Sequence, residues 1–125
     1  MKEVIYTKKA PEPVGPYSQA IDTGSLLFIS GQIPINPQEG KLVEGNIGEK
    51  TEQVMQNINA ILTEAGLNFD HVVKVSIFIK DMGNFAEINK VYASFFAAHP
   101  PAREVAAVNT LPLNSEIMIS VIACR

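Results

Sequence analysis

HVVKVSIFIK, residues 71–80, has the two-residue alternation of a β-strand. One side of the extended chain carries only branched aliphatic residues: Val73, Val75, Ile77 and Ile79. The other side mixes apolar and polar residues: Val72, Lys74, Ser76 and Phe78. This pattern predicts a strand with one face in the core and a second face that meets another subunit or a cleft.

One helix is expected before this strand in the sequence, and another after it. From Ile47 to Ala65, apolar residues recur in steps of three, four and seven, and Gly66 follows as the expected C-cap. Residues 81–99 carry a second helical face that ends at Pro100 and Pro101. The residues that share this face are Phe85, Ile88, Tyr92, Phe95 and Phe96.

Shorter strands are expected over residues 4–7, 26–30, 103–109 and 116–123, with a break at Gly31. Three prolines between residues 11 and 16 exclude a helix there, and residues 34–41 have the composition of a turn-rich loop. The order of elements predicts one α+β domain, residues 1–125, with a mixed sheet and two helices on one face. Its uncovered sheet face would then be buried against further copies in a cyclic oligomer.

Composition narrows the functional classes. Hydrophobic residues make up 46% of the chain and the net charge is −3, so neither disorder nor nucleic-acid binding is expected. The single cysteine, Cys124, excludes an intrachain disulfide and a Cys-rich zinc site. The chain has no apolar segment long enough to span a membrane, so we expect a cytoplasmic protein. No cofactor or metal motif is present, and His71 and His99 are expected to have ordinary surface or helix-end roles.

Arg103 is the residue most suited to chemistry. It follows two prolines and begins the apolar run REVAAV, at the rim of an expected buried strand. A guanidinium there is costly unless paired, and its planar fork matches a carboxylate in bidentate geometry. The local pattern leaves two interpretations open: an ion pair with one of the 13 acidic residues, or a binding site for an anionic ligand.

Six stretches of the chain together resemble the RidA/YjgF family of reactive imine deaminases, in order and without a large gap. They are GPYSQA (15–20), ISGQIP (29–34), VKVSIFIKDM (73–82), NKVYASFF (89–96), PPAR (100–103) and LPLNSEIMISVIA (111–123). The resemblance implies a chorismate-mutase-like fold and a homotrimer in which the sheets form an inner barrel. One site would lie in each of the three clefts between subunits.

The resemblance also implies roles for individual residues. Arg103 matches the family's carboxylate-binding arginine and is the expected catalytic residue. Further substrate contacts are expected from Tyr17, Ser30, Gly31, Asn89 and the main-chain carbonyl of Val105. The ordinary alternative is a half-buried ring for Tyr17 and a bend that ends a strand for Ser30 and Gly31. For Asn89 it is a solvated or locally bonded helical residue. Phe85 and Tyr92 are expected in the core rather than in the wall of the site.

The implied reaction is hydrolysis of 2-aminoacrylate, 2-iminopropanoate or 2-iminobutanoate to 2-keto acids and ammonia, without a cofactor, which protects other enzymes from damage. The chain departs from the family where a glutamate usually positions the water, because Met118 stands there and a thioether accepts no proton. Glu116 lies on the same strand face but further along, and Glu104 points to the opposite face from Arg103. A binding protein for small carboxylates without turnover is therefore an alternative. Endoribonuclease or translation-inhibitor activity is a third, less favoured one.

Overall fold

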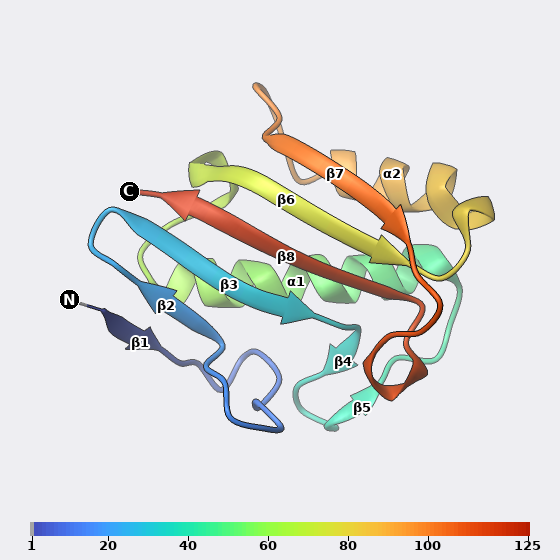
Figure 1. Cartoon of the computed structure of the whole chain (residues 1–125), viewed down its shortest axis with the longest axis horizontal. Coiled ribbons are helices and arrows are strands. Elements are labelled where there is room, and N and C mark those ends of the chain that lie inside the picture. The colour runs from blue at the N-terminus through green and yellow to red at the C-terminus, as the bar shows by residue number, and fades with distance from the viewer. Residues whose placement is uncertain (1) are drawn as a thin grey trace.

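A six-stranded sheet forms the body of the protein, and two helices pack on one of its faces (Figure 1). The computed structural model describes residues 2–125. Along the chain the strands of this sheet are β1 (Glu3–Ile5), β2 (Ala20–Asp22), β3 (Leu26–Gln32), β6 (Val72–Ile79), β7 (Ala102–Ala107) and β8 (Ile117–Cys124). Their order across the sheet is β1-β2-β3-β8-β6-β7, and only β6 and β7 are parallel neighbours. The predicted mixed sheet with two helices on one face is confirmed.

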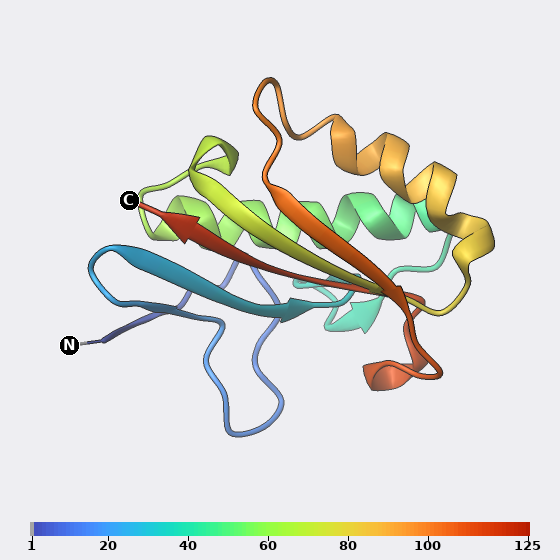
Figure 2. The same ribbon diagram turned by 45° about the horizontal axis from the view of Figure 1, so that its top comes forward.

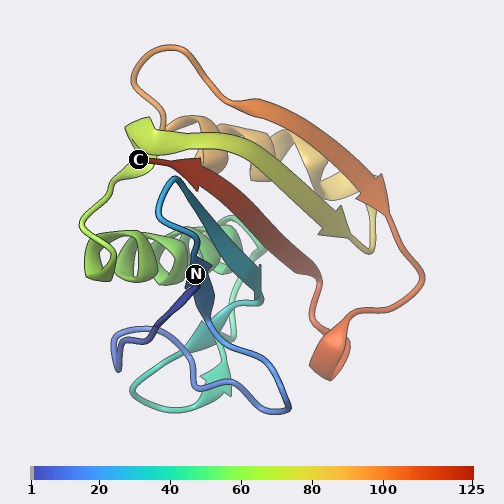
Figure 3. The same cartoon turned by 60° about the vertical axis from the view of Figure 1, so that its left-hand side comes forward.

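The helices are α1 (Ile47–Glu64) and α2 (Phe85–Ala93), and Figure 3 shows both on the same side of the sheet. α2 connects β6 to β7 and provides the crossover that a parallel pair needs. The core lies between helices and sheet, where residues of α1 and of the central strands have no accessible surface: Leu27, Val54, Ile58, Ile61, Leu62, Ile77 and Ile119. In the strand predicted over residues 71–80, the apolar side chains of Val75, Ile77 and Ile79 thus face the helices.

Side chains and a glycine define the ends of α1. The Oδ1 atom of Asn46 accepts the amide of Glu49 at 2.9 Å, and the Glu49 carboxylate accepts the amide of Asn46 at 3.0 Å. These reciprocal bonds satisfy two N–H groups that the first turn leaves free. At the other end Gly66 has a φ of 78°, the left-handed conformation expected of a C-cap glycine.

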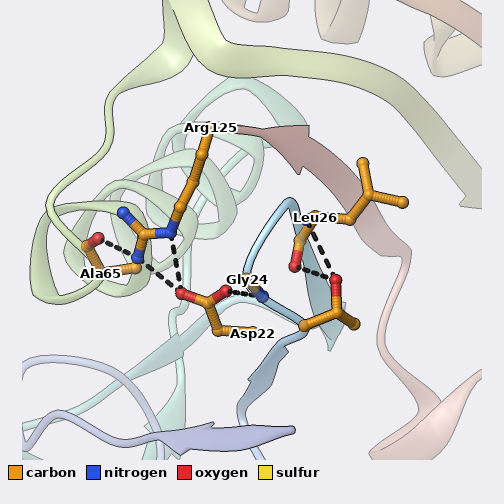
Figure 4. Close-up of polar contacts among 6 residues, drawn as sticks. Asp22, Gly24, Leu26, Ala65 and Arg125 are labelled. Atoms are coloured by element: carbon orange, nitrogen blue, oxygen red, sulfur yellow. Dashed lines mark hydrogen bonds and ion pairs between the residues drawn. The ribbon is translucent and has the colours of Figure 1, made fainter. Parts of the chain in front are cut away.

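The last residue of the chain ties α1 to the sheet (Figure 4). Arg125 donates to the carbonyl of Ala65 at 2.7 Å, just beyond the C-terminal end of α1, and its Nε atom donates to Asp22 at 3.0 Å. The amide of Gly24 donates to the same carboxylate at 2.8 Å. The Arg125 hydrogen bond first, and then the Gly24 amide, hold the pKa of Asp22 below its usual range.

The start of β6 differs from the prediction. Val72 is 5% exposed whereas Val73 is 46% exposed. The ladder pairs Val72 with Ala123 and then Lys74 with Ile122, so Val73 is the extra residue of a β-bulge. Because a bulge reverses the alternation on its N-terminal side, placing Val73 in the core and Val72 on the other face was wrong.

The second helix is shorter than the predicted range 81–99. A 3₁₀ turn, η2 (Met82–Asn84), precedes α2, and α2 ends at Ala93. The next three amides bond to carbonyls three residues back, which tightens the last turn and ends the helix. The aromatic residues beyond this end still pack inward, with Phe95 and Phe96 5.3 Å and 5.4 Å from the ring of Phe69 in the turn η1 (Phe69–His71).

Two loops contain short elements of structure. The turn-rich residues 34–41 contribute to a small hairpin of β4 (Ile35–Asn36) and β5 (Lys41–Leu42), whose strands are too short to show a period. Between β7 and β8, the turn η3 (Pro112–Asn114) holds Leu113 at a φ of 55°. Figure 2 shows η3 and the connector between β1 and β2 projecting away from the helices.

The sheet face opposite the helices carries apolar side chains that are open to solvent in a single copy. Phe28 on β3 is 41% exposed, although its neighbours Leu27 and Ile29 are buried. Exposed aromatic and aliphatic residues on one sheet face are typical of a surface that meets another protein chain. No helix within residues 2–125 combines the length and the apolar character needed to cross a membrane.

Candidate functional site

Arg103 lies on the edge strand β7 and points toward α2. It pairs with Val75 across the parallel ladder, and Val75 faces the helices. Its Nη1 atom donates to the Oδ1 atom of Asn89 at 2.7 Å. The guanidinium carbon lies 4.9 Å from the centre of the Tyr92 ring and 5.5 Å from that of Phe85. One hydrogen bond and two cation–π contacts therefore hold this cation in place.

Arg103 makes no ion pair with an acidic residue of residues 2–125. The three ion pairs in this part of the chain are Lys50–Glu116, Lys74–Glu104 and Arg125–Asp22. The expected burial of its strand was also wrong, because five of the six residues of β7 are exposed at this edge of the sheet. The interpretation of Arg103 as part of an intrachain ion pair is thus excluded for the described residues, and its remaining donors are open to a ligand.

A cavity of about 370 Å³ opens beside this arginine, and we call it the Arg103 cavity. Its other lining residues come from α2 and the segment after it: Asn89, Tyr92, Ala93, Phe96, Pro100 and Pro101. The hydroxyl of Tyr92 is buried and has no hydrogen-bond partner within residues 2–125. Burial raises the pKa of Tyr92, and the charge of Arg103 partly offsets that rise. Tyr92 is thus both a core residue, as predicted, and part of the wall of this cavity.

A second set of expected site residues gathers at the far end of β3. The ladder pairs Ile29 with Val121 and then Gln32 with Ile119, so Ser30 and Gly31 together oppose one residue of β8. This is a β-bulge, a feature that is frequent beside active sites. The strand was predicted to break at Gly31, and it instead continues through the bulge to Gln32.

Gly31 is in contact with the side chain of Met118. A Cβ atom added to Gly31 would lie 2.7 Å from the sulfur of Met118, which is closer than such atoms approach. Both residues and Tyr17 line an apolar pocket of about 150 Å³, the Met118 pocket. Its other lining residues are Pro11, Glu12, Val14, Gln19, Gln32, Ile33, Ile35, Pro112 and Leu113. Tyr17, near the start of the chain, and Met118, near its end, therefore border the same pocket.

Several polar groups at this end of the sheet form hydrogen bonds within the chain. The hydroxyl of Ser30 donates to the carbonyl of Ser18 at 2.6 Å, and its amide donates to Gln19 at 2.9 Å. The hydroxyl of Tyr17, in a side chain that is 49% exposed, accepts the amide of Val14 at 3.4 Å. Ser30 thus shapes the bulge, and the Tyr17 ring remains open to the Met118 pocket.

The structure brings the predicted site residues together in two groups rather than one. Arg103 and Asn89 line the Arg103 cavity, whereas Tyr17, Gly31 and Met118 line the Met118 pocket. The two spaces share no lining residue. Val105 lines neither space and is two residues beyond Arg103 on β7.

Glu116 and Glu104, the two acids near the position of the family glutamate, are each paired with a lysine. Glu116 lies 2.6 Å from the Nζ atom of Lys50 on α1 and does not line the Met118 pocket. Glu104 pairs with Lys74 at 3.1 Å and accepts the hydroxyl of Ser76. The bond from Ser76, followed by that from Lys74, holds the pKa of Glu104 below its usual range.

Sequence reasoning missed one carboxylate that does reach the site. Glu12, in the proline-rich connector, lines the Met118 pocket and accepts a hydrogen bond from the hydroxyl of Tyr6. This bond first, and then burial, raises the pKa of Tyr6. The connector has no secondary-structure period, so no sequence signal indicated where the side chain of Glu12 points.

Comparisons with known proteins agree with this fold. The family model described as Endoribonuclease L-PSP matches residues 7–125. A RutC family protein of Pyrococcus horikoshii is 51% identical over 125 residues, covering 100% of this chain and 99% of that protein. Chloroplastic Reactive Intermediate Deaminase A of Arabidopsis thaliana is 43% identical over 122 residues, covering 98% of this chain and 65% of that protein.

A solved structure extends the comparison to a relative with a bound ligand. The crystal structure of Escherichia coli TdcF with bound serine has a TM-score of 0.95 and 38% sequence identity, with 98% of each chain covered. The sequence and structural likenesses span nearly the whole chain, including both groups of site residues. The chain belongs to the RidA/YjgF family.

Proposed function

We propose that the protein hydrolyses small 2-imino acids to 2-keto acids and ammonia. In this proposal three copies form a ring, and each reaction site combines the Arg103 cavity of one copy with the Met118 pocket of the next. Arg103 binds the substrate carboxylate, and the Met118 pocket receives the rest of the molecule. At the level of the family, deaminase chemistry is supported by the relative named Reactive Intermediate Deaminase A.

The observation that carries this proposal is a fixed arginine without an acidic partner. Its guanidinium has five N–H donors, and one of them is used by Asn89 at 2.7 Å. The planar fork keeps two parallel donors for a carboxylate, the geometry in which arginine binds most strongly. A relative with bound serine is a further support, since serine carries a carboxylate and an amino group on one carbon.

The main task of the protein in this reaction is to orient the substrate and the attacking water. The C=N carbon of an imine is already electrophilic, so fixing the carboxylate and admitting water in the correct direction is the main requirement. The main-chain carbonyl of Val105 is placed two residues beyond Arg103 on an edge strand. In our proposal this carbonyl accepts the imine N–H and favours the protonated, more reactive form.

A ring of copies is supported by the two incomplete groups of site residues and by the open sheet face. Within one chain, the arginine and the Gly31 bulge border separate spaces. A cyclic arrangement brings different surfaces of adjacent copies together, and closure repeats that contact at every interface. It also removes Phe28, which is 41% exposed in a single copy, from water.

A second candidate function is favoured by the thioether beside Gly31. Met118 fills the space next to the bulge and presents no group that accepts a proton. A protein with Arg103 but without a proton acceptor would bind 2-keto and 2-imino acids and release them unchanged. Saturable binding without turnover, abolished by Arg103→Ala, is the result that would favour this function.

The deciding experiment is imine hydrolysis by the purified protein. An amino-acid oxidase generates the imine in place, and semicarbazide trapping reports how much imine remains. Hydrolysis faster than in buffer, with Arg103→Ala at the buffer rate, is expected. Equal rates with and without the wild-type protein would refute the proposed activity.

A further inference from the structure

We propose that Glu12 is the proton acceptor of this site. The inference rests on the proposed imine hydrolysis and adds a catalytic residue to it. The chemistry needs a base for the attacking water, and the Met118 pocket has one carboxylate among its described lining residues, Glu12.

The other polar side chains that line the pocket already form hydrogen bonds with the main chain. Gln19 is buried and bonds to main-chain atoms of Thr7, Ala10 and Pro11. Gln32 is also buried, and its amide donates to the carbonyl of Ser30 at 3.1 Å. The hydroxyl of Tyr17 accepts the amide of Val14 at 3.4 Å. Glu12 is thus the lining group suited to take a proton from water.

The size of the pocket keeps the carboxylate close to the reacting atoms. At about 150 Å³, the pocket is small. A carboxylate on its wall is therefore near any guest that enters. Glu12 is exposed, and the Tyr6 hydroxyl donates to its Oε1 atom. The second oxygen, Oε2, is available to a water molecule.

The proposed step is balanced. A water oxygen forms a bond to the imine carbon, Glu12 takes one proton from that water, and the π electrons of the C=N bond move to the nitrogen, which is already protonated. The resulting carbinolamine loses ammonia: Glu12 returns its proton to the amine, the C–N bond breaks, and the hydroxyl proton leaves to solvent as the C=O bond forms. The products are the 2-keto acid and ammonia.

The test is Glu12→Gln, which keeps the size of the side chain and an oxygen that accepts the Tyr6 bond. Each rate is divided by the buffer rate at the same pH, because the imine itself reacts differently as pH changes. We expect kcat to fall by about 10²-fold, the lower end of typical general-base effects, with KM nearly unchanged. The loss of rate enhancement at acid pH in the wild type should disappear in the variant, whereas Glu12→Asp should keep it with a reduced kcat.

Glu64→Gln is the matched control, since Glu64 is an exposed glutamate at the end of α1 and lines neither site. It should leave kcat and the pH profile unchanged. An active wild type whose kcat and pH profile survive Glu12→Gln would overturn the role of Glu12 and leave the proposed function intact. A wild type without turnover would overturn both.

Discussion

Replacement of Arg103 by alanine should weaken the binding of small 2-keto acids by about two orders of magnitude. Arg103 offers two parallel N–H donors beyond the one that Asn89 occupies at 2.7 Å. A hydrogen bond to a charged group contributes about 1.5–3 kcal/mol, and the exposure of this site favours the lower value. Two such bonds give about 3 kcal/mol, which corresponds to a roughly 10²-fold change in Kd.

Isothermal titration calorimetry with 2-oxobutanoate measures this change directly, because the keto acid carries the same carboxylate as the imine and does not react. Lys90→Ala is the control: Lys90 is an exposed cation on α2, next to Asn89, and its removal changes the net charge equally. The control should bind nearly as tightly as the wild type. If Arg103→Ala also kept the wild-type Kd, the carboxylate would be bound elsewhere and the reasoning would fail.

Three further predictions follow from the structure. Met118→Glu places a carboxylate beside Gly31 and, when added to Glu12→Gln, should raise the hydrolysis rate of that variant, measured by imine trapping, by up to about 10²-fold. An unchanged rate would contradict the position assigned to Met118. Ile77→Ala removes a side chain with no exposed surface from the central strand, and urea denaturation should report a loss of about 2–5 kcal/mol. Because the pKa of Asp22 is lowered from 3.8 in the folded protein, its contribution to stability is present at neutral pH and is lost as the pH falls below that value. The urea midpoint of Asp22→Asn should accordingly change less with acidification than that of the wild type; parallel curves would contradict the Arg125 contact.

Most of the fold could be predicted because it depends on periodic burial. The spacing of Val54, Ile58 and Ile61 places α1 on the core, and the alternation ending at Ile79 defines β6. Local hydrogen bonding, which has no period, accounts for the errors. The bulge at Val73 and the early end of α2 at Ala93 both depend on local main-chain hydrogen bonds that composition does not indicate.

The site could be predicted residue by residue only through the family resemblance. The sequence alone left open whether Arg103 pairs with an acid, because ion pairing depends on which strands and helices meet. The separation of Arg103 from Gly31 within one chain, and the position of Glu12 on the Met118 pocket, are properties of the folded chain. Glu12 lies in an irregular connector, and its partner Tyr6 is six residues away across that connector.

A complementation experiment tests most directly whether two copies build each site. Arg103→Ala disables the Arg103 cavity, and Gly31→Val drives the Met118 side chain, 2.7 Å from the new Cβ atom, into its pocket. The two inactive variants are co-expressed with different tags and purified through both tags. A three-membered ring of mixed composition always contains one site with two intact halves, so we predict about one third of the wild-type turnover per ring. Mixed rings as inactive as either parent would contradict a site shared between copies.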